Sequence, residues 1–263
     1  NEGLCRYLDR PDAAPYVIVL NQDMYLQPDA VEHLVQCMDR RPRCGIAAPL
    51  HLHRSNPRYV VSGGGLEAFP AGAWRHGPLA RFSQDVEVPW ADGACLMLRR
   101  EMIRRIDLVA RAFSAVGIGE GDKVTLCMPN CPQIVLCFYA LNRIGAIATM
   151  IHPLSSVGEI AFYIKDSDSR AVVTLDQFYG KFEEVRETVA IETLVLTSVA
   201  DALKPVMKLG YKLTEGRKVP KVPKDANVLW WKTFLSGAKN ADESCFVERK
   251  AEDPAVILFS GGT

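Results

Sequence analysis

Several features are missing from this 263-residue sequence, and each absence narrows what the protein does. It has no net charge, because 31 acidic residues balance 31 lysines and arginines. A neutral chain has no long-range electrostatic field that would gather nucleic acid or an anionic membrane. It also lacks the polar bias of disordered chains, since 48% of it is hydrophobic. We therefore expect a soluble globular protein with no nucleic-acid partner.

The eight cysteines include no C-x-x-C pair, which argues against a zinc site. Several of them fall inside apolar runs, such as Val124 to Met128, where a reduced and buried thiol is expected. A secreted chain of this size with eight cysteines would be expected to form disulfides. We therefore expect a cytoplasmic protein.

The sequence also lacks an uninterrupted apolar run long enough to cross a membrane. The longest apolar stretch, residues 134–151, is broken by Asn142, Arg143 and Gly145, which favours a helix, a turn and a strand. We expect no transmembrane segment. The sequence begins at Asn1 with no initiator methionine, basic leader or signal core, so we expect that Asn1 is not the natural start.

Lysine is absent from the first 107 residues, and this absence divides the chain. Residues 1–107 contain 13 arginines and no lysine, whereas residues 108–263 contain 6 arginines and 12 lysines. Arginine codons can be GC-rich and lysine codons AT-rich, so the shift suggests two genetic origins. The alternative is a chance run or a surface preference. We predict two domains, residues 1–107 and residues 108–263.

The first part has the pattern of an α/β unit. Tyr16 to Leu20 is a short β-branched run that predicts a buried strand, and Gly45 to Leu50 predicts a second one. Between them, Pro28 suits the first position of a helix. The apolar stripe of that helix recurs at helical spacing and consists of Val31, Leu34, Val35 and Met38.

Asn21 and Asp23 directly follow the first predicted strand. Open α/β sheets bind their ligands at the carboxyl ends of strands. A carboxylate at Asp23 would hold a divalent cation against a diphosphate there, with Asn21 beside it. The same pattern also forms ordinary turns, because both residue types satisfy nearby backbone groups. The pattern alone leaves both interpretations open.

Residues 1–107 resemble family 2 glycosyltransferases, and rhamnosyltransferase-like members in particular. The resemblance rests on Tyr-Val-Ile-Val-Leu-Asn-Gln-Asp at residues 16–23, Arg-Pro-Arg-Cys-Gly-Ile at residues 41–46, and Trp-Ala-Asp-Gly-Ala-Cys-Leu-Met-Leu-Arg-Arg at residues 90–100. It implies a glycosyltransferase A-like fold that moves a sugar from a nucleotide-sugar donor with Mn²⁺ or Mg²⁺. Asp23 would be the carboxylate that binds the metal and the sugar nucleotide, with Asn21 where many relatives have aspartate.

This part departs from the glycosyltransferase pattern in three ways. Asp92 stands where the family usually has a small residue. The upstream strand that would hold the nucleotide base is missing. The acidic general base expected after the Arg-Arg helix start is also missing, and transfer with inversion needs one. We therefore expect an incomplete glycosyltransferase site.

The second part alternates helix and strand, which predicts a parallel sheet with helices on both faces. A helix closed by Gly117 leads to a strand at Lys123 to Met128, and Pro132 opens the next helix. Ser156 and Glu159 form a capping box before a third helix. Further strands are expected at residues 146–151, 171–175, 193–196 and 256–259.

Residues 204–224 contain seven basic residues and one acidic residue, Glu215. Three prolines interrupt any long helix in this segment. We predict a solvated insertion. A role in binding a membrane surface or an acyl carrier is the alternative, so peripheral membrane contact stays open.

The end of the sequence predicts a phosphate-binding loop. An apolar run at residues 256–259, which predicts a buried strand, leads into Ser260, Gly261, Gly262 and Thr263. Glycines let the backbone approach a phosphate closely, successive N–H groups form an anion-binding concavity, and hydroxyls add donors. An ordinary turn is the alternative.

Residues 109–263 resemble the adenylate-forming, AMP-binding acyl-CoA synthetases. The resemblance rests on Gly-Asp-Lys-Val-Thr-Leu-Cys-Met-Pro-Asn at residues 121–130, Leu-Asn-Arg-Ile-Gly-Ala-Ile-Ala at residues 141–148, and Phe-Ser-Gly-Gly-Thr at residues 259–263. It implies small-molecule substrates: the acid reacts with ATP and Mg²⁺ to form an acyl-adenylate, and the acyl group then passes to CoA. Ser260, Gly261, Gly262 and Thr263 would contact the ATP phosphates, with Gly261 where many relatives have serine.

The two resemblances together predict an α/β chain of two incomplete parallel-sheet units. The first would be a glycosyltransferase A-like fragment and the second the N-terminal subdomain of an acyl-adenylate-forming ligase. In that family the adenine pocket, the acyl pocket and the catalytic lysine would lie beyond Thr263, so we expect an inactive fragment of a fatty acid:CoA ligase. The alternatives are a glycosyltransferase, and a chimeric, non-catalytic chain or interaction module.

Overall fold

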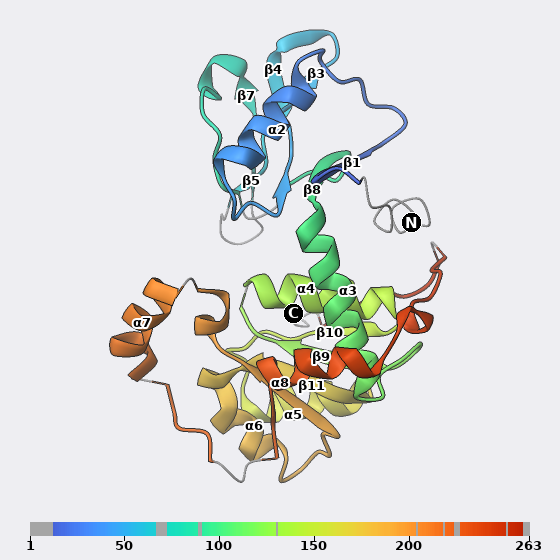
Figure 1. Cartoon of the computed structure of the whole chain (residues 1–263), viewed down its shortest axis with the longest axis vertical. Helices are drawn as coiled ribbons and strands as arrows, with labels where there is room; N and C mark the ends of the chain where they lie inside the picture. The colour runs from blue at the N-terminus through green and yellow to red at the C-terminus, as the bar shows by residue number, and fades with distance from the viewer. Residues whose placement is uncertain are drawn as a thin grey trace. The chain divides into compact units, whose positions relative to one another are not determined.

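A computed structural model of the chain describes residues 13–66, 73–88, 91–129, 131–203, 205–217, 219–223, 227–250 and 252–259 (Figure 1). The chain divides into two compact units, Asn1–Arg104 and Arg105–Thr263. This division falls within helix α3 (Arg100–Ala115), and the predicted domain boundary between residues 107 and 108 falls within the same helix.

The first unit is built on a three-stranded sheet whose middle strand runs against both neighbours. β8 (Cys95–Arg99) lies between β1 (Tyr16–Leu20) and β2 (Ile46–Ala47) and pairs antiparallel with each. The parallel sheet predicted for this unit is therefore wrong for the described strands. The physical reason is that a strand from the end of the unit separates the two predicted strands, so they never pair with each other.

The core of the first unit is small. β1 was predicted to be buried, but Val19 and Leu20 are 43% and 42% exposed. α2 (Ala30–Arg40) begins after the predicted start at Pro28, and Asp29 is its N-cap. The buried core residues come from α2, β2 and β8 and are Leu34, Met38, Ala47 and Met97.

Short strands complete the first unit. They form a second antiparallel sheet and a separate two-stranded pair. The sheet consists of β3 (His51–His53), β4 (Asn56–Ser62) and β7 (Gly77–Pro78), and the pair of β5 (Gly65–Leu66) and β6 (Ala73–Trp74). A 3₁₀ turn, η1, covers Leu79–Arg81.

The second unit contains a six-stranded sheet in which every described pairing is parallel, as the sequence predicts. The order across the sheet is β13-β12-β11-β9-β10-β14. The burial predicted for the strand at residues 256–259 is wrong, because β14 is the last described strand of this order and Leu258 is 70% exposed. The strands are β9 (Lys123–Cys127), β10 (Ile147–Met150), β11 (Ser169–Leu175), β12 (Thr193–Thr197), β13 (Leu229–Trp230) and β14 (Val256–Leu258).

Helices cover both faces of this sheet, as Figure 1 shows. Val173 packs into the cluster with α3, α4 and α8, and its neighbour Val172 packs into the cluster with α5 and α6, because successive strand residues point to opposite faces. The helices are α4 (Pro132–Arg143), α5 (Val157–Asp166), α6 (Tyr179–Val185) and α8 (Trp231–Ser236).

The local signals of the second unit are confirmed. Pro132 is the first residue of α4. Gly117 ends the α3 segment with a φ of 83°, which glycine adopts without a Cβ clash. The Ser156 hydroxyl accepts from the Glu159 N–H at 3.3 Å, and the Glu159 carboxylate accepts from the Ser156 N–H at 2.7 Å. These reciprocal bonds form the predicted capping box.

The basic segment after residue 203 contains a helix, α7 (Pro205–Leu213), that the sequence did not predict. Pro205 is at its first position, where a proline is tolerated, and Pro220 and Pro223 lie beyond its end. Short 3₁₀ turns connect the elements of the second unit: η2 (Asp176–Phe178), η3 (Val199–Ala202), η4 (Glu215–Arg217), η5 (Gly237–Asn240) and η6 (Glu243–Cys245). Across the described residues, every helix is too short or too polar to cross a membrane.

The cysteines within the described residues are all free thiols. Cys127 and Cys137 are fully buried. Burial raises the pKa of the Cys127 thiol to about 12 and raises the pKa of Cys137 well above its ordinary value. These two thiols therefore stay protonated at neutral pH, and the cytoplasmic location inferred from cysteine usage stays a prediction.

Candidate functional site

The carboxyl edge of the six-stranded sheet is the candidate site. β9, β10 and β14 are neighbours and run parallel, so their carboxyl ends at Cys127, Met150 and Leu258 lie on one edge. Open α/β sheets bind ligands outside this edge. The chain therefore leaves β14 at the edge where a phosphate-binding loop is expected.

The predicted loop residues Ser260, Gly261, Gly262 and Thr263 lie outside the described residues. Phe259 comes directly before them, and its ring stacks on Tyr163 of α5, with ring centroids 4.2 Å apart and planes 25° apart. The stack fixes the residue that enters the loop against the helix that follows β10. Sequence reasoning missed this stack, because helical spacing placed Tyr163 only on an apolar face.

Lys181 holds the loop between β10 and α5. Its Nζ donates to the Pro153 carbonyl at 3.0 Å and to the Ser155 carbonyl at 2.7 Å. An ammonium group is thus fixed beside the carboxyl end of β10, where its positive charge favours an anion. Nothing in the local sequence marks Lys181, because its partners are backbone carbonyls.

A buried polar network lies at the carboxyl ends of β11 and β12. The Gln133 amide, 3% exposed, donates to the Thr197 hydroxyl at 3.2 Å and to the Ser198 carbonyl at 3.1 Å. The Thr197 hydroxyl donates to Asp201 at 3.2 Å. Burial raises the pKa of Asp176 at the end of β11, and a hydrogen bond from Ser198 partly opposes this shift. The network ties the first turn of α4 to the edge of the sheet.

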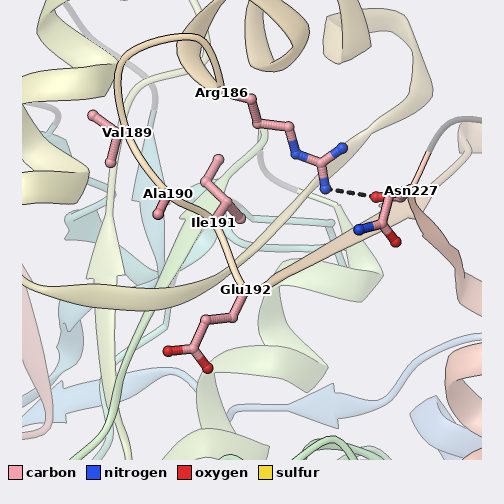
Figure 2. Close-up of a pocket in the computed structure, with 6 residues that line it drawn as sticks. All are labelled: Arg186, Val189, Ala190, Ile191, Glu192 and Asn227. Carbon is pink, nitrogen blue, oxygen red and sulfur yellow. Dashed lines mark hydrogen bonds between the residues drawn. The ribbon is translucent and has the colours of Figure 1, made fainter.

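A shallow pocket of about 360 Å³ lies at the opposite edge of the sheet (Figure 2). Its residues come just before β12 and β13, at their amino ends, and Arg186 donates to the Asn227 carbonyl at 2.6 Å. Since ligands of such sheets bind at the carboxyl edge, this pocket plays no part in the candidate site.

The first unit places Asn21 and Asp23 where β1 ends, and both are exposed. The Asn21 N–H donates to the Ala94 carbonyl at 2.9 Å, which joins the end of β1 to the start of β8. Asp92 lies at the same junction, because its carboxylate accepts from the Ala94 N–H at 3.0 Å and lies 3.5 Å from Nδ1 of His51.

These residues do not assemble into a metal centre. Across the described ranges of both units, there is no group of three or more His, Cys, Asp or Glu residues that would hold a metal ion. The structure therefore brings Asn21 to β8, and among the described residues Asp23 is not part of a group of three such side chains. The metal-binding role of Asp23 and Asn21 stays a prediction.

Comparison with known proteins identifies one family. The model of the AMP-binding enzyme family matches residues 97–263, which is more than half of the chain. The match begins within β8, ahead of residue 109, where the sequence resemblance was placed. The comparisons give no support for a glycosyltransferase in residues 1–107.

Two curated relatives illustrate the similarity. A long-chain-fatty-acid–CoA ligase of Bacillus subtilis is 30% identical over 151 residues, which cover 56% of this chain and 26% of the relative. An acetyl-coenzyme A synthetase of Pyrobaculum aerophilum is 30% identical over 174 residues, which cover 63% of this chain and 23% of the relative. The chain thus spans about a quarter of the length of these relatives.

A solved structure gives a weaker likeness. The anthranilate CoA ligase AuaEII in complex with anthranoyl-AMP is 16% identical, with a TM-score of 0.48 over 63% of this chain and 28% of that chain. A likeness this weak does not define the site, so the family assignment depends on the family match.

Proposed function

The chain belongs to the AMP-binding enzyme family, and from that premise we propose that it is the amino-terminal part of an ATP-dependent carboxylic acid:CoA ligase. The ligase would join a fatty or similar carboxylic acid to AMP and then transfer the acyl group to CoA. ATP, Mg²⁺ and CoA are the cofactors of this reaction. Because the chain spans about a quarter of its relatives, we expect it to be inactive alone and assign the activity to the whole protein.

The position of β14 carries the proposal. Its pairing with β10 puts Leu258, the last residue of β14, at the carboxyl edge. Ser260, Gly261, Gly262 and Thr263 follow this strand in the sequence and are proposed to contact the ATP phosphates. Two features of the edge support an anion there. α4 and α5 follow β9 and β10, so their amino ends, with partial positive charge, face the same edge. The ammonium group of Lys181 adds a full positive charge.

The described residues fit a phosphate group better than they fit a metal ion. A phosphate loop needs a strand end with glycines after it, and β14 supplies the strand end. No residue within the described ranges is assigned to Mg²⁺, because these ranges contain no cluster of metal-binding side chains. We therefore derive no step of the adenylation through the metal.

Pyrophosphate exchange tests the proposal. Adenylation is reversible, so a ligase given a carboxylic acid, ATP and labelled pyrophosphate returns the label to ATP. In the protein translated from the complete reading frame, Ser260→Ala and Thr263→Ala should each slow the exchange by about 10- to 100-fold, since each removes a hydrogen bond to a charged group. Ser244→Ala, at an exposed serine in η6, is the matched control. Normal exchange in both loop variants would contradict the assigned role.

A second candidate function is sugar transfer by the first unit. The geometric observation that favours it is the position of Asp23 and Asn21 where β1 ends, joined through Asn21 to β8. The nucleotide sugar would bind with Mn²⁺ or Mg²⁺ at Asp23. The absence of a group of three or more metal-binding side chains among the described residues weighs against it.

Binding of UDP- and dTDP-sugars in the presence of Mn²⁺ tests this candidate. Calorimetry should show binding that Asp23→Ala abolishes and that Asp29→Ala, at an exposed aspartate before α2, leaves unchanged. If the unsubstituted chain binds none of these sugars, the candidate is wrong.

The third candidate is a chimeric, non-catalytic chain or interaction module. The difference in composition favours it, because residues 1–107 contain arginine and no lysine whereas residues 108–263 contain more lysine than arginine. Sequencing of the source DNA in long reads tests it. A chimera assembled from separate genes predicts that no read crosses the codons for residues 106–110. Reads that cross them continuously would refute an assembly artefact.

A further inference from the structure

α7 presents its apolar side chains to solvent. Val206 is 84% exposed, Leu209 is 61% exposed and Leu213 is 54% exposed. α5, a helix of similar length in the same unit, instead buries Ile160 and Ile164 completely or nearly so. α7 therefore contributes no apolar stripe to the core of the second unit.

The exposed side chains form one continuous face. Val206, Met207, Leu209 and Leu213 fall within an arc of about 160° when successive residues are 100° apart. We call these four residues the apolar face of α7. Met207, at 49% exposed, completes it.

The protein contacts α7 from outside this arc. The Lys208 ammonium lies 3.7 Å from Asp201 of η3. Tyr211 lies beside η4, where a Cβ placed on Gly216 would be 3.2 Å from its ring. The helix is thus held through its more polar side, and the apolar face points away from the fold. Figure 1 shows α7 at one side of the second unit, apart from the helices that cover the sheet.

The charge of the surrounding segment is strongly one-sided. Residues 204–224 contain seven basic residues and one acidic residue, which leaves six positive charges in a chain with no net charge. The rest of the chain therefore carries six negative charges. Arg217 and Lys221 are exposed. The net charge of zero, which excludes a long-range electrostatic field, does not reveal this local excess of positive charge.

We propose that α7 and the exposed basic residues Arg217 and Lys221 dock the protein on the surface of an anionic lipid bilayer. The apolar face would enter the boundary between headgroups and acyl chains, and the basic side chains would contact anionic headgroups. The helix is about 14 Å long at 1.5 Å per residue, which is half the thickness of the hydrocarbon core, so it lies on the membrane and does not span it.

A lipid surface fits these observations better than a protein partner does. The apolar face is a broad convex surface, and a bilayer adapts to such a shape without a complementary groove. The positive charge of the segment is also complementary to anionic lipid headgroups. Long basic side chains beside an apolar helical face are typical of helices that bind at a membrane surface.

Co-sedimentation of the full chain with lipid vesicles tests the proposal. The chain should sediment with phosphatidylcholine vesicles that contain phosphatidylserine at about one third of the lipid, and added salt should weaken the binding. It should not sediment with vesicles of phosphatidylcholine alone. No binding to either kind of vesicle, or equal binding to both, would overturn the proposal.

Two sets of variants separate the apolar from the electrostatic contribution. Val206→Ser/Leu209→Ser/Leu213→Ser should weaken binding by about tenfold or more, whereas Leu154→Ser, at a leucine 74% exposed elsewhere in the unit, should bind like the unsubstituted chain. Arg217→Gln/Lys221→Gln should weaken binding about 25-fold, at about fivefold per charge. Lys232→Gln/Lys239→Gln, at exposed lysines outside the segment, is the matched control.

Because the substituted residues are exposed, the variants should keep the circular dichroism spectrum of the unsubstituted chain. Equal losses in test and control variants would overturn the proposal. The proposal would also be overturned if the chain binds no vesicles but forms a dimer, and the apolar triple variant is a monomer. The apolar face would then bind a second copy of the chain.

Discussion

The two units differ in how their strands are buried. In the second unit, β9, β11 and β12 lie inside a parallel sheet covered on both faces, and Val124, Val172 and Leu194 are 1% exposed or less. In the first unit, β1 is an edge strand with Val19 and Leu20 about 40% exposed, and the described hydrophobic cluster has four buried residues. Strands buried on both faces have continuous apolar sequences, so the parallel sheet of the second unit was predicted correctly. In the first unit, the strand at residues 16–20 is confirmed, but its burial and the parallel sheet were predicted wrongly.

The difference in burial predicts that the second unit is the more stable one. A core truncation in the second unit should therefore have the larger effect. Phe113 is fully buried and meets Phe234 edge to face, with centroids 4.9 Å apart. Phe113→Ala should lower the free energy of unfolding of the second unit by about 3–5 kcal/mol, because it removes the ring and leaves a cavity. Urea unfolding followed by hydrogen exchange and mass spectrometry resolves the two units by their peptides. A loss of less than about 1 kcal/mol would contradict the packing described.

The matching truncation in the first unit is Met38→Ala, at a residue that is fully buried in α2. We expect a loss of about 2–3 kcal/mol, because the neighbours in a small core can relax into the cavity. Peptides from α2 and β8 should lose protection first in the same exchange experiment, while peptides from β9 and β11 keep theirs. If both units lost protection together, they would unfold as one and the comparison would fail.

A smaller effect is expected at the capping box of α5. Ser156→Ala should cost about 1 kcal/mol of stability, because it leaves the Glu159 N–H without its acceptor. Thermal unfolding of the second unit measures this loss. Ser236→Ala, at an exposed serine whose side chain makes no capping hydrogen bond, should change the transition less.

The same cap makes a contribution that depends on pH. Hydrogen bonds from the N–H and hydroxyl of Ser156 lower the pKa of Glu159 below its ordinary value. A carboxyl whose pKa is lower in the folded state stabilises the fold above its unfolded pKa and loses that contribution as the pH falls through the folded pKa. Glu159→Gln should therefore be less stable than the unsubstituted chain at neutral pH and equally stable in strong acid. A difference that does not change with pH would show that the charge is irrelevant.

The sequence predicted the features that depend on near neighbours in the chain. The capping box at Ser156 and Glu159, the turn at Gly117 and the helix start at Pro132 each involve residues a few positions apart, and the structure contains all three. The parallel order of the sheet followed from the alternation of helix and strand.

Features that depend on distant residues were not predicted. The pairing of β1 with β8 joins residues such as Tyr16 and Arg99, and no local pattern encodes it. The stack of Phe259 on Tyr163 and the contacts of Lys181 with backbone carbonyls are of the same kind. α7 differs, because Val206, Leu209 and Leu213 have helical spacing that the prolines and lysines of the segment obscured.

The central claim is that the ligase function belongs to the part of the chain matched by the AMP-binding family, residues 97–263. The most direct test measures carboxylate-dependent pyrophosphate exchange by the protein from the complete reading frame, before and after removal of residues 1–96. We predict exchange in both forms, because the carboxyl edge of the six-stranded sheet lies wholly in the second unit. Absence of exchange in the complete protein, or its loss from a shortened protein that is still folded, would contradict the account.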